Sequence, residues 1–543
     1  MEWLRRVVSE ILVRGDDPVV LSTGKTPSGP IHIGSERELF MCDSMRRLLE
    51  EKGKRVRFLF IVDSFDPFKS VPAGLQVPES FKEHIGKPLC DVPDPFGECH
   101  NSYAEHFAEE FLEVQDKLGV SPEVIYAHQL YTREEMKNAI RTVLCKLELL
   151  QEIRSRYVFS PEEGSQEWVP VMVVCERCGM LAPKIAGEVH PNRISSFNLD
   201  EDLVEYRCNA CGYEGSIEIS RGRIKLSWRV DWAAKWSIFK VTCEPAGKDH
   251  CVKGGAYDMG LEVSQRIFGY RGPIKVPYEW LTLEGKAMKT HKGITFTPAE
   301  WLSVAPPEVM RYMILSVDPM RHISFSPLKI PDLVDSFDRL ERIYFDAEAP
   351  SEAEDPEELK LLYEMCLVDG VPDSLPARLP YRFAVFYVQL IPLLGYERVL
   401  ERSITMAAKT YRRSSLSREE ISNVMLRLTM AMNWVEKYAP ERWKFSITEE
   451  LLPEAASKLT DSQRNFLSRL ATSFGSKEWD EQELQNYVFT LARDMGLTPQ
   501  EAFKAVYLAL LGREYGPRLA PLLLALEKKW VVERLMKASS LTA

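Results

Sequence analysis

Residues 21–35 read Leu-Ser-Thr-Gly-Lys-Thr-Pro-Ser-Gly-Pro-Ile-His-Ile-Gly-Ser, and this glycine- and proline-rich stretch decides the fold. The apolar run at residues 18–21 predicts a buried strand, and the apolar positions within residues 39–49 recur at the spacing of a helix. The stretch between them is therefore predicted to be a strand-to-helix turn. Ligands of α/β proteins bind at such turns, next to the carboxyl ends of the strands.

The segment Gly24-Lys25-Thr26 matches the last three residues of the phosphate-binding P-loop motif. That motif also needs a glycine five positions before Gly24, where this chain has Val19. It further needs a helix to begin at the position of Pro27, and a proline there stops one. We therefore do not expect a P-loop.

The remaining part of the turn is Pro-Ser-Gly-Pro-Ile-His-Ile-Gly-Ser at residues 27–35. A glycine that lets the backbone approach a ligand, beside the His32 imidazole at a helix N-terminus, suits the phosphates of a nucleotide. The imidazole can also stabilise the charge of a transition state. Taken by themselves, these residues are equally compatible with a purely structural turn.

Composition limits the class of protein. A chain of 543 residues with 45% apolar residues predicts two to four globular domains. The N-terminus lacks the apolar run of a signal peptide, and no stretch is long enough to cross a bilayer, so we expect a cytoplasmic protein without membrane contacts. Eleven cysteines then favour metal sites and buried thiols over disulfides. The net charge of -11 requires any nucleic-acid partner to bind a local basic surface.

The pattern along the chain predicts a nucleotide-binding fold that is interrupted once. Residues 18–63 have the strand-helix-strand order of one half, with the second strand at residues 56–62. An acidic, proline-bearing linker at residues 346–356 precedes a region with helical patterns and almost no alternation. We expect an α/β, Rossmann-type nucleotide-binding catalytic domain in two halves, at residues 1–64 and 226–345. Between the halves we expect a zinc-ribbon and helical insertion, at residues 65–225. An all-α C-terminal domain follows, at residues 346–543.

Two acids follow the second predicted strand. Asp63 and Asp66 stand at its carboxyl end, where a carboxylate can meet a ribose or a metal, or form part of an ordinary loop. Because strand ends are commonly polar, we favour a loop or a supporting position for both.

Four cysteines form two matching Cys-x-x-Cys-Gly knuckles, at residues 175–179 and 208–212. Each knuckle places two thiolates on one tight turn, and four soft ligands without an open position make a tetrahedral structural zinc centre. The predicted ligands are Cys175, Cys178, Cys208 and Cys211. The role of this zinc ion would be in folding.

A second set of metal-ligand residue types lies at residues 94–106. Asp94, Cys99, His100 and His106 offer a carboxylate, a thiolate and two imidazoles, which is an acceptable zinc set. Adjacent cysteine and histidine side chains must bend to face one ion, and histidines near helix starts are common, so an unliganded surface is the alternative.

Residues 24–38 resemble the "HIGH" signature of class I aminoacyl-tRNA synthetases, in the form found in the class I lysyl-tRNA synthetase family. Their sequence pattern is Gly-x-Thr-Pro-Ser-Gly-Pro-Ile-His-Ile-Gly-x-x-Arg-Glu. Further segments resemble the same family at residues 93–107, 434–442 and 511–519, so the resemblance covers essentially the whole chain. In that family the segment corresponding to residues 93–107 holds a metal ion.

The second class I signature, Lys-Met-Ser-x-Ser-Lys-Gly, is a mobile loop whose ammonium groups neutralise departing pyrophosphate. Residues 287–293, Ala-Met-Lys-Thr-His-Lys-Gly, occupy its place. Ala287 stands where the first lysine belongs, and Lys289 and His291 replace the two serines. Lys286 and Lys289 are candidates to supply the displaced charge.

The resemblance implies activation of L-lysine with ATP and Mg²⁺, followed by transfer to tRNA(Lys). It implies that His32, Gly34, Lys289 and Lys292 act in catalysis. It implies that ATP is held by Pro27, Ser28, His32, Gly34, Asp249, Met288, Lys289 and Lys292. It implies that lysine is held by Gly24, Thr26, Glu38, Trp228, His250 and Tyr278, with Glu38 as the ammonium partner. Trp228 and Trp232 bracket Asp231, and this acid between aromatic walls also suits a lysine side chain.

The resemblance also implies that the helical C-terminal domain binds the anticodon of the tRNA. We expect a monomer. Two other functions remain open at this point: a catalytically altered paralogue that binds tRNA or acylates another acceptor, and a nucleotidyltransferase of the same fold that uses no tRNA.

Overall fold

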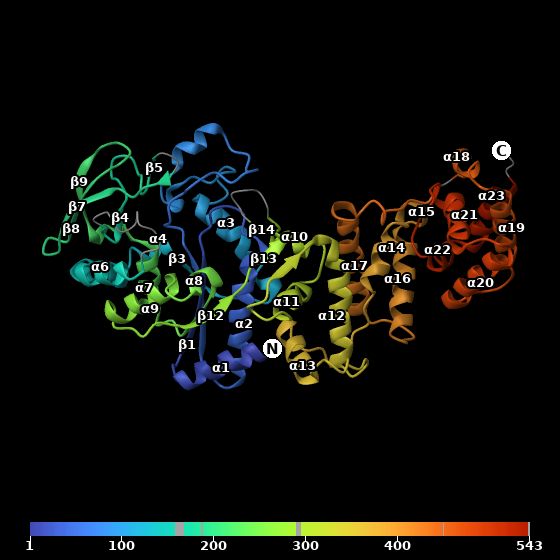
Figure 1. Cartoon of the computed structure of the whole chain (residues 1–543), viewed down its shortest axis with the longest axis horizontal. Helices are drawn as coiled ribbons and strands as arrows, with labels where there is room; N and C mark the ends of the chain where they lie inside the picture. Colours follow the sequence, from blue (N-terminus) through green and yellow to red (C-terminus); the bar gives the residue numbers. More distant parts are fainter. Residues whose placement is uncertain (158–167, 186–187, 289–294, 449, 541–543) are drawn as a thin grey trace. The chain divides into compact units, whose positions relative to one another are not determined.

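A computed structural model describes the chain except residues 158–167, 186–187, 289–294, 449 and 541–543. The chain divides into two compact units (Figure 1). The N-terminal unit comprises Met1–Leu302, Pro306–Ser326 and Leu340–Val371. The C-terminal unit comprises Ser303–Ala305, Pro327–Arg339 and Pro372–Ala543. Within the described ranges, no helix combines the length and apolarity that spanning a membrane requires.

Parallel strands form the central sheet of the N-terminal unit, in the order β12-β11-β1-β2-β3. These strands are β1 (Val19–Lys25), β2 (Val56–Val62), β3 (Glu123–Tyr126), β11 (Cys243–Gly247) and β12 (Ile274–Tyr278). The sheet confirms the predicted α/β class, and its central strand β1 leads directly into the quoted turn. Because the strands are parallel, their carboxyl ends lie along one edge, and the residues that follow them meet there.

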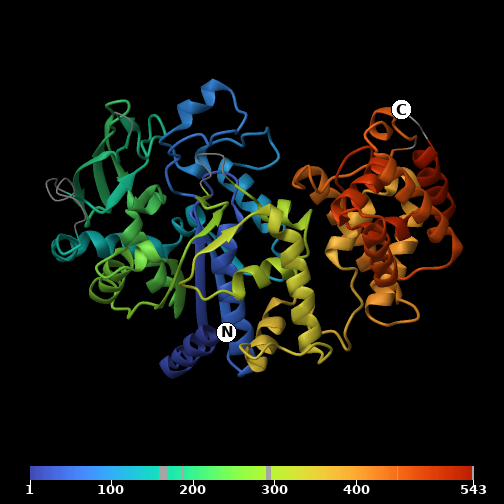
Figure 2. The same ribbon diagram turned by 45° about the vertical axis from the view of Figure 1, so that its right-hand side comes forward.

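Helices cover both faces of this sheet (Figures 1 and 2). On one face lie α1 (Glu2–Arg14), α2 (Glu36–Glu51) and α3 (Tyr103–Leu112). On the other face lie α5 (Glu134–Cys145), α7 (Trp228–Phe239) and α9 (Ala256–Arg266). Alternate residues of β1 point to opposite faces: Val20 enters the core with α7 and α9, whereas Thr23 reaches α2.

The insertion between the two halves of the fold is part helical and part β-ribbon. Its helices include α4 (Ala127–Leu130) and α6 (Leu147–Ser155). The ribbon is an antiparallel sheet of β7 (Arg193–Asn198), β8 (Leu203–Arg207) and β9 (Glu214–Glu218). Further short strands are β4 (Val171–Val173), which pairs with β10 (Ile224–Leu226), and β5 (Lys184–Ile185), which pairs with β6 (Glu188–Val189).

The sequence predicts one apolar strand over residues 276–283, and the structure divides it. After β12 the chain leaves the central sheet, and β13 (Leu281–Leu283) pairs with β14 (Lys286–Ala287) and β15 (Ile323–Phe325). The break occurs at Glu279, whose N–H donates to the Pro319 carbonyl and whose carbonyl accepts from the buried Arg37. Polar contacts from distant segments thus end the strand, which an apolar pattern cannot reveal.

Residues 346–371 cluster with the N-terminal unit, whose last residue is Val371. Helix α13 (Pro356–Cys366) is held there by Tyr363, which donates to Glu341, and by Arg311, which donates to the Met365 carbonyl. The assignment of functions to the domains stays a prediction. Further helices along residues 248–344 are α8 (Lys248–Cys251), α10 (Pro298–Leu302), α11 (Pro307–Leu315) and α12 (Ile330–Tyr344), of which α12 begins in the C-terminal unit.

The described elements of residues 372–543 are all helical, as the sequence predicts. Several of the longer helices begin with side-chain caps, such as Ser417 before α17 and Thr498 before α21. These helices are α14 (Tyr381–Val388), α15 (Ile391–Leu394), α16 (Tyr396–Thr410), α17 (Arg418–Lys437), α18 (Pro453–Ala456), α19 (Asp461–Ser476), α20 (Glu481–Asp494), α21 (Pro499–Leu511), α22 (Leu519–Ala525) and α23 (Lys528–Ser540).

Candidate active site

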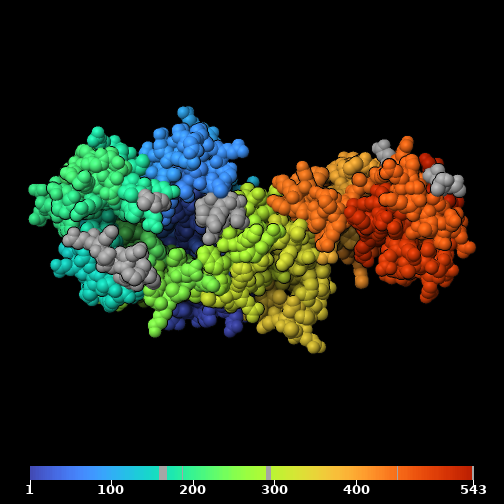
Figure 3. Space-filling model, turned by 45° about the horizontal axis from the view of Figure 1, so that its top comes forward, coloured from blue at the N-terminus to red at the C-terminus, as the bar shows by residue number. Residues whose placement is uncertain are grey.

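A cavity of about 880 Å³ opens at the carboxyl ends of the central strands. Figure 3 shows the molecule hollowed here, with the dark blue N-terminal segment at the base of the hollow. Of the residues expected to bind ATP or lysine, the following line the cavity: Gly24, Thr26, Ser28, Glu38, Trp228, Asp249, His250 and Tyr278. The cavity lies where parallel sheets bind their ligands.

The quoted turn ends in a short 3-10 helix at Ile33–Ser35, and α2 follows directly. The Nδ1 atom of His32 accepts a hydrogen bond from the Gly34 N–H at 3.1 Å, which caps this helix and fixes the ring. Burial, assisted by the nearby Lys25 ammonium, lowers the pKa of His32 to about 3. The imidazole is therefore neutral at neutral pH.

The two signature segments lie side by side. The Ile33 N–H donates to the Phe296 carbonyl at 2.9 Å, and a Cβ atom added to Gly34 would lie 3.3 Å from the Met288 side chain. Pro27, His32, Gly34 and Met288 stand beside the cavity and are not among the residues that line it. Lys289 and Lys292 lie outside the described residues.

Glu38 brings β1, α2 and β12 together. Its carboxylate accepts hydrogen bonds from the Thr23 hydroxyl and from the Tyr278 hydroxyl. Burial raises the pKa of Glu38, and both donors and the Lys25 charge oppose this rise. The side chain is thus an oriented acid on the wall of the cavity, which suits a cation.

A second acid of the site, Glu244 on β11, was not predicted from the sequence. Its two oxygens accept hydrogen bonds from the indole N–H groups of Trp232 at 2.6 Å and of Trp236 at 2.7 Å. Burial raises the pKa of Glu244 to about 7. The signal that identifies it is an acid within an apolar strand, opposite two tryptophans spaced four residues apart on one helix.

The acid between Trp228 and Trp232 lines the cavity, but protein groups already pair with it. Asp231 is buried, and its carboxylate contacts Lys225 at 3.1 Å, Lys235 at 2.7 Å and the Tyr131 hydroxyl at 2.7 Å. Because α7 turns this residue toward the interior, its charge is already neutralised.

Asp63 and Asp66 line the cavity but are occupied by protein groups. Asp63 pairs with Lys235, and Asp66 contacts Lys225 at 3.1 Å and accepts from the Thr26 hydroxyl at 2.8 Å. These contacts agree with a supporting position, and the hydrogen bond from Thr26 ties Asp66 to the turn.

Trp228 and His250 form an aromatic wall, with ring centroids 5.6 Å apart. Trp228 remains 46% exposed, so its face is open to a ligand. Gly24 has a packing reason to be glycine, since a Cβ atom there would lie 2.7 Å from the Ile61 carbonyl of the neighbouring strand.

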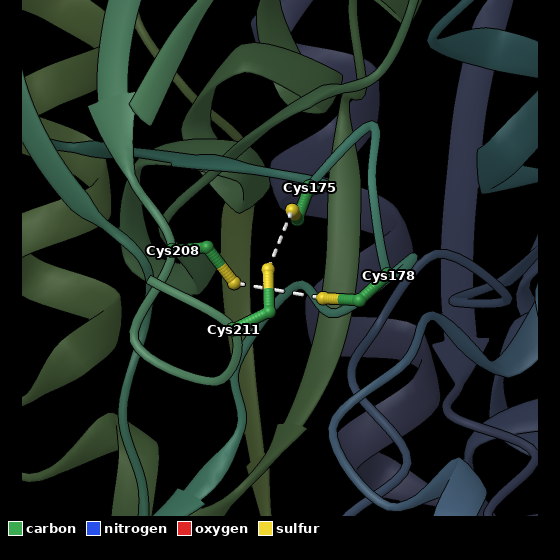
Figure 4. A group of neighbouring side chains, drawn as sticks. All are labelled: Cys175, Cys178, Cys208 and Cys211. Carbon is green, nitrogen blue, oxygen red and sulfur yellow. Dashed lines mark hydrogen bonds between the residues drawn. The ribbon is translucent and has the colours of Figure 1, made fainter. Parts of the chain in front are cut away.

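The cysteine knuckles converge as predicted (Figure 4). The Sγ atoms of Cys175 and Cys211 lie 3.7 Å apart, and those of Cys178 and Cys208 lie 3.6 Å apart. A tetrahedral site with Zn–S bonds of about 2.3 Å separates its sulfurs by about 3.8 Å, so this donor set fits zinc. The glycine after each knuckle adopts positive φ, 75° and 70°, which closes the turn.

The second set of metal-ligand types also converges, at the N-terminal end of α3. The ligand atoms of Asp94, Cys99, His100 and His106 all lie within 4.8 Å of one another. The Nδ1 atoms of His100 and His106 are 3.1 Å apart, a contact between two ring nitrogens that a shared cation would satisfy. The Asp94 carboxylate faces both rings.

The parallel sheet, the His-Ile-Gly-Ser turn after its central strand and the adjoining second signature segment define a class I aminoacyl-tRNA synthetase. Residues 1–368 match the family described as "tRNA synthetases class I (K)", and residues 424–539 match "Anticodon binding domain". The chain belongs to this lysine family of class I tRNA synthetases, as the resemblance implied.

Relatives match over their full length. A protein of Methanocaldococcus jannaschii named "Lysine--tRNA ligase" is 36% identical, and the match covers 98% of this chain and 99% of the relative. Proteins of the same name are 35% identical in Archaeoglobus fulgidus, over 99% and 100% of the two chains, and in Thermococcus kodakarensis, over 98% and 99%.

Proposed function

We propose that this chain is a lysine–tRNA ligase, which activates L-lysine with ATP and transfers it to tRNA(Lys) in translation. The family and the full-length relatives support the activity. The observation that carries the choice of substrate is the pair of acids, Glu38 and Glu244, on the wall of a cavity with an aromatic side. An ammonium on an apolar stem needs both features.

In the activation step, a carboxylate oxygen of lysine attacks the α-phosphorus of ATP. The bond to the bridging oxygen breaks, and pyrophosphate leaves with the electron pair and its Mg²⁺. Catalysis is mainly positioning and charge stabilisation. We assign ATP to the turn with Pro27, Ser28, His32 and Gly34, with further contacts from Asp249, Met288, Lys289 and Lys292. The neutral His32 imidazole, whose Nδ1 accepts from the Gly34 N–H, would donate a hydrogen bond there from its Nε2–H without adding charge.

Lysine would lie between Glu38 and the aromatic wall. Glu38 pairs with the ε-ammonium, while Thr23 and Tyr278 hold the carboxylate in place. Gly24, Thr26, Trp228 and His250 complete this pocket. An uncharged side chain would leave the buried acid without a partner. The enzyme would therefore discriminate against it by about 10²- to 10⁴-fold, on the order of 3–5 kcal/mol.

Zinc is proposed at both converging clusters. At the first, Cys175, Cys178, Cys208 and Cys211 fill all four positions, so the ion would crosslink the ribbon and take no part in the reaction. At the second, Asp94, Cys99, His100 and His106 would hold a further zinc ion near the start of α3.

The remaining assignments follow from the same proposal. Residues 346–543 would bind the anticodon, and residues 65–225 would contact the acceptor end of the tRNA. The monomeric state and the cytoplasmic location stay predictions.

Lysine-dependent exchange between ATP and pyrophosphate tests the proposal. We expect exchange with lysine, much weaker exchange with arginine or ornithine, and aminoacylation of tRNA(Lys) at a similar dependence on lysine. Absence of exchange with all amino acids would contradict it and favour a catalytically altered paralogue, which the alanine at position 287 motivates. Exchange that is unaffected by tRNA, with no aminoacylation, would favour a nucleotidyltransferase.

A further inference from the structure

Lys25 is the last residue of β1 and lines the cavity. It lies two residues after Thr23, so both side chains leave the strand on the face that carries α2. Its ammonium is close enough to affect the pKa of Glu38 and that of His32. Lys25 therefore lines the same cavity as the acid assigned to the lysine ammonium and lies within electrostatic range of the turn assigned to ATP.

This ammonium has no partner in the part of the chain that the structure describes. None of the ion pairs or side-chain hydrogen bonds of the described residues includes Lys25, whereas the other interior lysines, Lys225 and Lys235, each contact two carboxylates. Burial lowers the pKa of Lys25, and the Glu38 charge opposes this only in part. An anion bound beside Lys25 would restore its charge.

The second signature segment lacks the lysine expected at its first position. Ala287 replaces the first lysine of the second signature, and its neighbour Met288 packs against Gly34 of the turn. The loop thus lacks a lysine at this signature position, and Lys286 and Lys289 beside it are displaced from it, while β1 carries a lysine that has no ion pair within the described residues.

We propose that Lys25 is a catalytic residue that binds a phosphate group of ATP and supplies the charge that the loop lacks at Ala287. This inference rests on the proposed function. The position of Lys25 is the one that resembled a P-loop lysine, and the role is the same although the loop is not a P-loop: a point charge held against the triphosphate. In the activation step it stabilises negative charge as the bond to pyrophosphate breaks.

The test measures lysine-dependent ATP–pyrophosphate exchange in the full-length protein. Replacement of a preorganised donor in such a site costs about 10²-fold, so Lys25→Met and Lys25→Gln should lower kcat/KM for ATP by about that factor. The KM for lysine should change less than about threefold. Lys25→Arg should retain more activity than either neutral variant, since it keeps the charge.

The decisive variant is the double substitution Lys25→Met with Ala287→Lys. We expect the added lysine at position 287 to recover at least about tenfold of the lost kcat, because either cation can serve the same phosphate. Lys69→Met is the matched control, since Lys69 also lines the cavity but is exposed. Melting temperatures of all variants report on folding.

The outcomes separate this inference from the proposed function. Exchange in the wild type with unchanged kinetics in Lys25→Met would overturn the inference and leave the function intact. A change confined to the KM for lysine would also overturn it, because Lys25 would then act on the amino acid. No exchange in the wild type would refute the function itself.

Discussion

At the residue scale, the cavity holds two acids that neutral neighbours orient, together with Lys25, which has no ion pair within the described residues. Glu38 is held by two hydroxyl groups and Glu244 by two indoles. Neutral donors orient a carboxylate without neutralising it, so its charge remains available for a substrate. Asp231 shows the opposite arrangement, because two lysines already neutralise it.

Glu38→Gln should lower kcat/KM for lysine by about 10²–10³-fold, since a cationic substrate loses its buried partner. The measurement is the exchange rate as a function of lysine concentration. Tyr278→Phe, which removes one hydrogen bond to the acid and keeps its charge, should cost only about tenfold or less. Equal losses in the two variants would show that the charge of Glu38 is not what lysine requires.

Gly34→Ala should abolish most of the activity while the protein stays folded. A Cβ atom there would lie 2.8 Å from the His32 ring and 3.3 Å from Met288, so the ring must leave its position. We expect kcat to fall by about 10²-fold or more, as for other small displacements of catalytic groups. Gly247→Ala is the control, because its Cβ would meet only the Tyr278 hydroxyl, at 3.9 Å. Wild-type kcat in Gly34→Ala would refute the role of this turn.

At the scale of single elements, local sequence patterns determine some features and long-range contacts determine others. The knuckles, the turn and the helix α2 follow from short segments, because each needs only neighbours in the chain. Helix α2 nevertheless carries a buried acid that no local rule explains: Glu36 is fully buried and accepts a hydrogen bond from Gln115 at 2.8 Å.

Glu36→Gln should stabilise the protein at alkaline pH. Burial raises the pKa of Glu36 from 4.5 to about 8, so between these values the folded state holds a proton that the unfolded state has released. Stability therefore falls as the pH rises from 4.5 to about 8. We expect the variant to melt higher than the wild type at pH 8.5 and equally at pH 5, with the exposed Glu50→Gln as control. A difference that does not depend on pH would contradict the assignment.

Metal analysis of the purified protein should give two equivalents of zinc. Cys178→Ser should lose one equivalent and lower the melting temperature, because the ribbon loses its crosslink. His106→Ala should lose the other equivalent and leave the first in place. The exposed Cys145→Ser should change neither. Retention of both equivalents in Cys178→Ser would exclude the knuckles as the zinc site.

At the scale of the whole molecule, one buried arginine joins four distant parts of the N-terminal unit. Arg311 on α11 pairs with Asp43 on α2 at 2.6 Å, and it donates to the Leu118 and Met365 carbonyls at 3.2 and 2.7 Å. Both members of the pair are fully buried. This contact explains why residues up to 371 belong to the unit, although the acidic linker suggests a boundary at 346.

Arg311→Leu should destabilise the N-terminal unit by about 3–5 kcal/mol, because it leaves Asp43 and two carbonyls buried with fewer partners. The melting temperature measures the loss. Arg55→Leu breaks an exposed pair with Asp17 and should cost less than about 1 kcal/mol. Equal effects of the two substitutions would contradict the importance of burial.

The sequence by itself determined the features that depend on neighbours in the chain: the turn at residues 21–35, the parallel α/β class, the paired knuckles and the helical C-terminal region. It also identified the family, because the signature words are local. Only the tertiary structure decided which charged groups pair with protein groups and which line the cavity. Asp231 and Asp66 became neutralised, Glu244 and Lys25 came to line the cavity, and one predicted strand was divided at Glu279. The ion pairs of Asp66 with Lys225 and of Asp63 with Lys235 join residues more than a hundred positions apart, and no pattern of adjacent residues encodes them.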